Sequence, residues 1–385
     1  MNAVRKLATI VDEWFTAPEA NAAGRIGLFR ILYSAFYLWH TSFQFAASMA
    51  GFPASHQRRV FLVALLPANL PTGFFMLLES VLVAALVLLV VGFRVRLVTA
   101  AVLIAGSLLE AFYTRADPEY ATLFVVFYIP LFMLLCNARW GATYSVDALL
   151  LRRAGKARIE PSNSSGAFFI PARAVLVMLS LLFLSAASLK MASGGTWLNQ
   201  PRFIADLMLA DNVKASIDGT PLNALAPLIS ESPVVYRWLL YQTIVFEALF
   251  FLTLFNRGVR NLFIAVALVF HAVGAIWLSV TFTPILVVYG LYVDWQKLRE
   301  RIWPNPVNVL AAVPTGVLVA TAICAAVGAG ALWNHGNGLR SIINMNGWLN
   351  WHTVWYPVLP IVSVWLILTG KDAVRWVGAE KRIAS

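Results

Sequence analysis

Long apolar runs recur along the chain and limit what it can fold into more strongly than any motif does. A helix that crosses a bilayer needs about 20 mostly apolar residues, and ten segments approach this requirement. They lie at residues 24–49, 71–92, 95–113, 120–136, 172–189, 235–255, 261–280, 283–294, 308–333 and 353–369. The eighth is the weakest, because Pro284 opens it and charge follows at Asp294 and Lys297. The runs predict an all-α fold, a polytopic membrane bundle of about ten transmembrane helices.

Composition and charge agree with this class. Hydrophobic residues make up 60% of the 385 residues and charged residues 12%, which is far from the usage of a soluble domain. A net charge of +11 would also suit nucleic acid, but most of the 29 lysines and arginines fall in alternate loops, as the positive-inside rule describes. We therefore expect a lipid bilayer rather than nucleic acid as partner, a multi-pass location in the cell membrane, and both termini in the cytoplasm.

Changes in composition divide the chain into three parts. Residues 1–20 predict an amphipathic helix on the membrane surface, because apolar side chains recur there at helical spacing. Residues 21–305 form the main membrane domain, and residues 306–385 add two further hydrophobic helices. Within the membrane domain, residues 191–233 form an extracytoplasmic insertion broken by glycine and proline. This insertion is either a lid over the bundle or a solvated structural loop.

Two ionisable residues, Glu247 and His271, lie within the sixth and seventh runs. Such side chains are costly in hydrocarbon and usually face a bundle interior or a wet cavity. Both lie about ten residues from the turn at 257–260, which is roughly 15 Å along a helix. We expect them to face each other near mid-membrane, either as a structural polar clasp or as a couple that carries a proton or binds a ligand.

Four further ionisable residues lie in or near the runs. Lys190 lies at the end of the fifth run. A lysine desolvated there can act as a base; in the alternative, its side chain extends to the membrane–water interface. Arg30 in the first run would bind an anionic headgroup or a helix end. Glu79 and Glu110 are expected at span ends or interfaces rather than as ligands.

The sequence carries none of the common metal-binding or catalytic motifs. The two cysteines, Cys136 and Cys324, have no metal-ligand spacing around them. Neither a phosphate-binding loop nor a hydrolase triad is present. We therefore expect no metal cofactor.

Four stretches of the chain resemble a known membrane domain. They read AAGRIGLFRILYSAFYLWH at 22–40, YSVDALL at 144–150, LKMASGGTW at 189–197, and FEALFFLTLFNRGVRNLFIAVALVFHAVGAIWLS at 246–279. Their order and spacing resemble the membrane domain of vitamin K-dependent gamma-carboxylases, which also occurs alone as the horizontally transferred transmembrane (HTTM) family. The resemblance covers roughly residues 20–300 and identifies residues 21–305 as an HTTM-like membrane domain.

The resemblance implies a reaction centre as well as a fold. Lys190, which precedes Trp197, takes the place of the base that deprotonates a reduced quinone. The implied cofactor is a reduced naphthoquinone of the vitamin K or menaquinol type. Among the site residues, Lys190, His271 and Glu247 would serve the chemistry, with the last two as a support or proton relay, and Arg30 and Trp197 would bind the cofactor.

Two departures argue against peptide carboxylation. Residues 117–120 read Asp-Pro-Glu-Tyr where the carboxylases carry a catalytic histidine. After residue 306 the chain continues with hydrophobic helices in place of the soluble region that handles the glutamate substrate. We therefore expect no carboxylation of peptides.

Two functions of different classes follow. In the first, the protein is an enzyme that oxidises or epoxidises a lipid-soluble quinol at the outer face. In the second, it is a non-enzymatic membrane component for peptide export, maturation or immunity, with a membrane or peptide partner, and its buried polar residues form a clasp.

Overall fold

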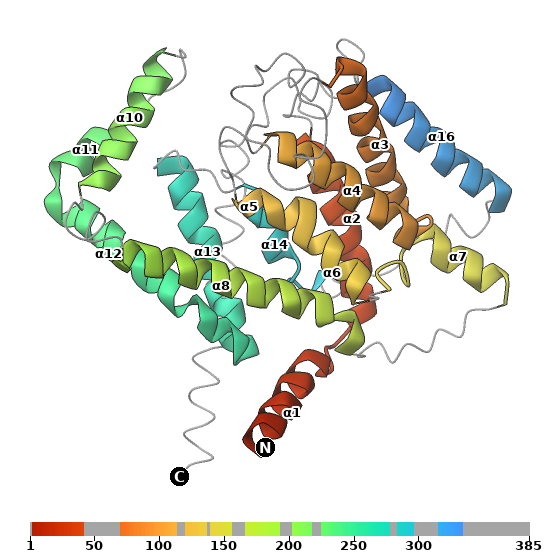
Figure 1. The fold of residues 1–385 in the computed structure, drawn as a ribbon, viewed down its shortest axis with the longest axis horizontal. Coiled ribbons are helices and arrows are strands. Elements are labelled where there is room, and N and C mark those ends of the chain that lie inside the picture. The colour runs from red at the N-terminus through yellow and green to blue at the C-terminus, as the bar shows by residue number, and fades with distance from the viewer. Residues whose placement is uncertain are drawn as a thin grey trace. The chain divides into compact units, whose positions relative to one another are not determined.

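The computed structural model describes residues 2–41, 70–113, 120–136, 139–155, 166–192, 202–217, 225–277, 283–295 and 315–333. Helices make up almost all of these residues, and no strand occurs among them (Figure 1). The all-α prediction is therefore confirmed for this part of the chain.

Five helices in the described ranges are long and apolar enough to cross a membrane. They are α3 (Thr72–Val91), α4 (Val95–Tyr113), α8 (Ile170–Ala192), α12 (Pro233–Leu249) with its 3₁₀ continuation η6 (Phe250–Leu254), and α13 (Arg257–Trp277). Large apolar side chains such as Leu77, Leu97 and Val245 are exposed on them, as expected for surfaces that face lipid.

Four other predicted spans are helical in part. The first corresponds to α2 (Ala22–Thr41), and the ninth to α16 (Thr315–Trp333). The eighth contains α14 (Ile285–Gly290), which is short, as Pro284 and the nearby charges led us to expect. The fourth consists of α5 (Tyr120–Leu123), the π-helical turn η4 (Phe124–Tyr128) and α6 (Ile129–Leu135). The tenth, at 353–369, lies outside the described residues.

The chain groups into two compact units, and each is described by itself. The first comprises Met1–Val175 and Pro284–Trp348, and the second Leu176–Thr283 and Leu349–Ser385. This grouping differs from a boundary at 305/306, because α16 packs on α3. The first helix of the C-terminal extension is thus part of the first unit.

Aromatic residues with polar ends join the helices of the first unit. Tyr33 of α2 donates a hydrogen bond to the carbonyl of Val125 in η4, at 2.8 Å. Its ring lies 5.7 Å from that of Trp140, which donates to the hydroxyl of Thr99 in α4 at 3.2 Å. Buried tyrosine and tryptophan usually satisfy their polar atoms in this way, and these bonds fix α2 against α4 and η4.

The N-terminal helix α1 (Asn2–Thr16) ends at a buried cluster of charges. Arg173 of α8 donates to the carbonyls of Phe15 and Ala17, at 2.6 and 2.7 Å. Glu19 accepts a bond from Arg25 at 3.2 Å and lies 3.9 Å from Arg173. Two arginines around one carboxylate therefore fix the direction in which α1 leaves the bundle.

The residues of the predicted insertion that the structure describes are mostly helical and belong to the second unit. It contains α10 (Phe203–Ile217) and α11 (Leu225–Glu231). Their buried apolar side chains pack against the first turns of α12, in a cluster of Ala205, Met208, Ala226, Ile229, Tyr236 and Leu239. The insertion is thus held on α12 by apolar contacts.

Candidate functional site

A buried ion pair joins two of the spanning helices of the second unit. The Nζ atom of Lys190, near the end of α8, lies 2.5 Å from both carboxylate oxygens of Glu247 in α12. The two side chains are 15% and 9% exposed. The ammonium of Lys190 therefore lies against the carboxylate, and most of its side chain is shielded from solvent.

Contacts along the two helices show how this pair forms. Ser180 lies 3.4 Å from Thr253 between hydroxyl oxygens, and the rings of Phe183 and Phe250 are 4.5 Å apart. Ser180 pairs with Thr253, and the later residue Phe183 pairs with the earlier residue Phe250. The two helices therefore run antiparallel. About two turns beyond Phe183, the same register brings Lys190 to the face of α12 that carries Glu247.

The pair has a chemical capability that neither residue has alone. A single charge inside hydrocarbon is costly, whereas an ammonium on a carboxylate leaves no net charge. Transfer of the proton from nitrogen to oxygen removes both charges together, and it leaves a neutral amine that can accept a proton from another group. Lys190 and Glu247 can therefore store or pass a proton with little change in local charge.

His271 lies in an aromatic layer of the same unit. Its ring is 5.3 Å from that of Phe270 and 6.3 Å from that of Phe183. The rings of Phe246 and Phe270 stack at 5.2 Å. Because these phenylalanines directly precede Glu247 and His271, the two ionisable residues lie at one level of the α12–α13 hairpin.

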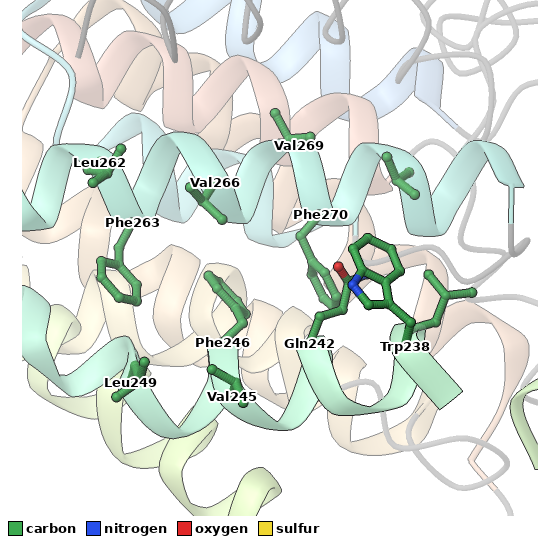
Figure 2. Close-up of a pocket in the computed structure, with 12 residues that line it drawn as sticks. Trp238, Gln242, Val245, Phe246, Leu249, Leu262, Phe263, Val266, Val269 and Phe270 are labelled. Atoms are coloured by element: carbon green, nitrogen blue, oxygen red, sulfur yellow. The ribbon is translucent and has the colours of Figure 1, made fainter. Parts of the chain in front are cut away.

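An apolar groove lies between α12 and α13, with a volume of about 540 Å³. Figure 2 shows Phe246, Phe263 and Phe270 along it, with Trp238 and Gln242 toward one end. Volumes of roughly 300–1,000 Å³ are typical of small-molecule sites. Phe246 and Phe270 line the groove and also contact Phe183 and His271, respectively. Rings of the aromatic layer thus form part of the wall of the groove.

Arg30 belongs to the first unit, and its surroundings differ from those of Lys190. It is fully buried and donates to the carbonyls of Trp140, Thr143 and Tyr144, at 3.0, 3.4 and 2.6 Å. Gly92 lies against it with a φ of 73°, and a Cβ atom there would meet its Nη1 at 2.8 Å. The guanidinium thus binds the backbone of the loop at 139–145. The other residue expected at the cofactor, Trp197, lies outside the described residues.

The stretch YSVDALL at 144–150 has a structural role beside Arg30. Ser145 begins α7 (Val146–Arg153) and accepts the N–H of Ala148 at 2.9 Å. Asp147 accepts the N–H groups of Arg94 and Val95 at the start of α4, at 2.8 and 2.9 Å. Ser145 at the start of α7 and Asp147 in its first turn therefore cap two helices.

Sequence reasoning missed three arrangements of buried polar groups. These are the contact between Lys190 and Glu247, the cluster around Glu19, and the burial of Glu79 and Glu110. The first needed the pairing of α8 with α12, which no local pattern reveals. The last had a signal, since an acid inside an apolar run more often faces the interior of a bundle than lipid.

Within the described ranges, no group of three or more histidine, cysteine or acidic side chains is arranged to hold a metal ion. Comparisons of the chain with protein-family models, with curated proteins and with solved structures found no match. The geometry of the site is therefore the guide to function, and the family resemblance stays a prediction.

Proposed function

We propose that the chain is a gamma-carboxylase-like membrane protein of the HTTM type, in which Lys190 and Glu247 deprotonate a reduced, lipid-soluble naphthoquinone. One observation carries the proposal: a lysine in a spanning helix lies 2.5 Å from both oxygens of a buried carboxylate. Such a pair can present a neutral amine to a bound quinol, as deprotonation requires.

The proposed reaction is epoxidation of the quinol by dioxygen. Glu247 holds the proton of the ion pair, and the free amine of Lys190 then removes the proton of one quinol hydroxyl. The resulting anion reacts with dioxygen, which is the oxidant. One oxygen atom ends in the epoxide and the other in water, so the quinol gives four electrons and dioxygen takes four. The two hydroxyl hydrogens of the quinol leave in that water.

The groove between α12 and α13 supports a lipid-soluble substrate. Its walls are almost entirely apolar, and Gln242 supplies an amide among them. An isoprenoid tail would bury apolar surface there. His271, at the level of Glu247, would relay protons to and from the Lys190–Glu247 pair.

The proposal also includes the topology of the whole chain. Ten spans, both termini in the cytoplasm and a location in the cell membrane account for the distribution of basic residues. Five spanning helices in the described part, and exposed Ile10 and Val11 on the amphipathic helix α1, support this topology. Cysteine-accessibility labelling at Thr9 and Lys381 would test the position of the two termini.

The central experiment measures epoxide directly. Purified protein in nanodiscs, supplied with a reduced naphthoquinone and dioxygen, should yield epoxide detectable by mass spectrometry. Lys190→Ala should abolish the product, while Lys6→Ala, which removes an exposed lysine of α1, should leave it unchanged. Absence of epoxide together with absence of a quinone-induced thermal shift in the wild type would reject the enzyme.

One observation favours a second, non-enzymatic function. Both carboxylate oxygens of Glu247 are occupied by the same ammonium, as in a clasp that only joins helices. In that case the protein is a non-enzymatic component for peptide export, maturation or immunity. The reversed pair, Lys190→Glu with Glu247→Lys, separates the two functions, because a clasp tolerates reversal and a base positioned for a quinol does not.

A further inference from the structure

Four exposed arginines gather at one end of the first unit, and we term this region the basic surface. Its members are Arg94 and Arg96 in the turn into α4, Arg139 at the start of the loop at 139–145, and Arg152 in the last turn of α7. The proton chemistry proposed above uses none of them. Arg30, which donates to the same loop from the interior, already has carbonyl partners. The reaction centre therefore gives the basic surface no function.

Contacts between three segments of the chain hold the basic surface together. Asp147 of α7 accepts two backbone N–H groups at the start of α4, at 2.8 and 2.9 Å. Gly141 packs so closely on this start that a Cβ atom would meet Cγ2 of Val95 at 2.7 Å. Arg139 is two residues from Gly141, and Arg152 is five residues from Asp147, about 7.5 Å along a helix. The backbones that carry the four arginines therefore belong to one packed end of the unit.

Positive charge dominates this surface. Within the segments 92–97 and 139–155 the only acid is Asp147, and its carboxylate binds the N–H groups of α4. None of the four arginines forms an ion pair with another residue of the described ranges. Arg153, the neighbour of Arg152, donates to the hydroxyl of Thr315 at the start of α16, at 2.6 Å. The basic surface therefore presents a net positive charge to its surroundings.

The basic surface lies where a membrane has its headgroups. Here α3 ends and α4 begins, next to α7 (Figure 1), and both are long and apolar enough to cross a bilayer. Leu97, directly after Arg96, is 74% exposed, as expected for a side chain that faces lipid. Tyr144 in the loop and Leu151 next to Arg152 are also exposed. Aromatic and basic residues together are common at the membrane–water interface.

The opposite ends of the same helices differ in charge. The loop at 139–145 also contacts the start of α2, because Thr143 donates to the carbonyl of Ala23 at 2.8 Å. Away from this loop, the described parts of α2 after Arg30, of α3 and of α4 after Arg96 contain no lysine or arginine, and neither does α16. The basic surface therefore faces one leaflet only.

Two residues of this region adopt a backbone conformation that is rare outside glycine. Arg94 has a φ of 47° and Tyr144 a φ of 52°. Asp147 holds the N–H of Arg94 at 2.8 Å, and Arg30 holds the carbonyl of Tyr144 at 2.6 Å. Strained residues that their surroundings hold in place are typical of functional sites. Both side chains are thus presented from a backbone that cannot easily rearrange.

We propose that the basic surface binds the phosphate groups of anionic phospholipids in the adjacent leaflet. A guanidinium can donate two parallel hydrogen bonds to a phosphate, and basic residues beside the ends of spanning helices attract anionic headgroups. Each lipid would engage one or two arginines, so no single pocket is required. Leu97 and Leu151 would contact the acyl chains. An acidic protein fits less well, because the arginines border a helix surface that faces lipid.

The first arm of the test compares two lipids. Purified full-length protein is reconstituted in nanodiscs of equal parts phosphatidylcholine and phosphatidylglycerol, and native mass spectrometry counts the lipids that stay bound. The wild type should retain phosphatidylglycerol in excess, and higher ionic strength should reduce this excess because salt screens exposed charges. Equal retention of the two lipids by the wild type overturns the proposal, and this outcome does not require any variant to fold.

The second arm locates the bound lipid. Arg94→Gln, Arg96→Gln, Arg139→Gln and Arg152→Gln should each lower the excess of phosphatidylglycerol roughly two- to fivefold. Arg202→Gln, which changes an exposed arginine of the second unit, should keep it. An excess that persists in all four variants would place the lipid elsewhere and would also overturn the proposal.

The third arm separates the lipid from other anions. Phosphatidylglycerol in the nanodisc should raise Tm by roughly 2 to 4 °C, whereas inorganic phosphate or polyglutamate, added to phosphatidylcholine nanodiscs at fixed ionic strength, should not. An equal rise with phosphate alone would identify a site for free anions, and a rise with polyglutamate alone would identify a site for an acidic protein. Either result rejects the lipid. All three arms are independent of whether quinol is oxidised.

Discussion

Arg30 in the first unit and Lys190 in the second are both largely shielded from solvent, and the partners of these two cations differ. Arg30 in the first unit is surrounded by three backbone carbonyls, which are neutral and fixed by the chain. Lys190 in the second unit faces the carboxylate of Glu247, which can take up a proton. A guanidinium held by carbonyls can only hold structure together, because neither side can exchange a proton. An amine held by a carboxylate can hold structure together and can also exchange a proton.

The largest effect is expected at Arg30. Arg30→Ala removes the donors of three carbonyls in a buried loop and leaves a cavity, so we expect a loss of about 4 kcal/mol in the free energy of unfolding. Denaturation by SDS, followed by tryptophan fluorescence, measures this. Arg30→Lys should recover part of the loss. A near-normal stability of Arg30→Ala would show that the loop does not depend on the guanidinium, and the contrast with Lys190 would fail.

A smaller loss is expected when the ion pair is broken. Glu247→Ala leaves an ammonium without its counter-charge inside hydrocarbon, which should cost about 3 kcal/mol. Lys190→Met combined with Glu247→Leu should be much closer to the wild type, since apolar residues often replace a buried pair without loss. A double-mutant cycle with additive effects would mean that the two residues do not interact.

Gly92→Ala tests the region around Arg30 from the opposite side. The residue adopts a φ of 73°, and a new Cβ would clash with Cβ of Ser145 and would also meet Nη1 of Arg30 at 2.8 Å. We expect a loss of about 2 kcal/mol, from the backbone conformation and the contact together. Gly155→Ala is the matched control, because it has a φ of 65° and open space around it. Equal losses for the two variants would assign the whole effect to the backbone.

The smallest effect is expected at an exposed ion pair. Arg202 and Asp206 lie 3.3 Å apart on the surface, at 68% and 60% exposure. Arg202→Ala should change stability by at most about 0.5 kcal/mol, because water screens such pairs. A loss as large as that of Glu247→Ala would show that burial does not explain the strength of the Lys190–Glu247 pair.

The sequence predicted the features that depend on local pattern. Glu247 and His271 could be placed at one level because both are counted from the same turn, at 257–260. Lys190 lies 57 residues before Glu247, and its position depends on how α8 slides along α12. That register is set by Ser180, Phe183 and their partners, none of which stands out in the sequence.

The same reasoning applies to Arg30, Glu79 and Glu110. Arg30 was predicted from the sequence to bind a helix end or an anionic headgroup. In the structure it donates hydrogen bonds to carbonyls of the loop at 139–145. Glu79 and Glu110 were expected at span ends, yet both are buried in the first unit. Which face of an apolar helix turns inward is decided by its neighbours, because such helices are apolar on all sides.

The capping of α4 by Asp147 has a consequence for the order of biosynthesis. The carboxylate closes the start of a helix that emerges from the ribosome about fifty residues earlier, and the carbonyls that hold Arg30 come from the same late loop. Until this loop is synthesised, α2 to α4 can enter the membrane but cannot lock together. A nascent chain stalled just before residue 139 should therefore stay protease-sensitive, and one released beyond residue 155 should become resistant in a single step.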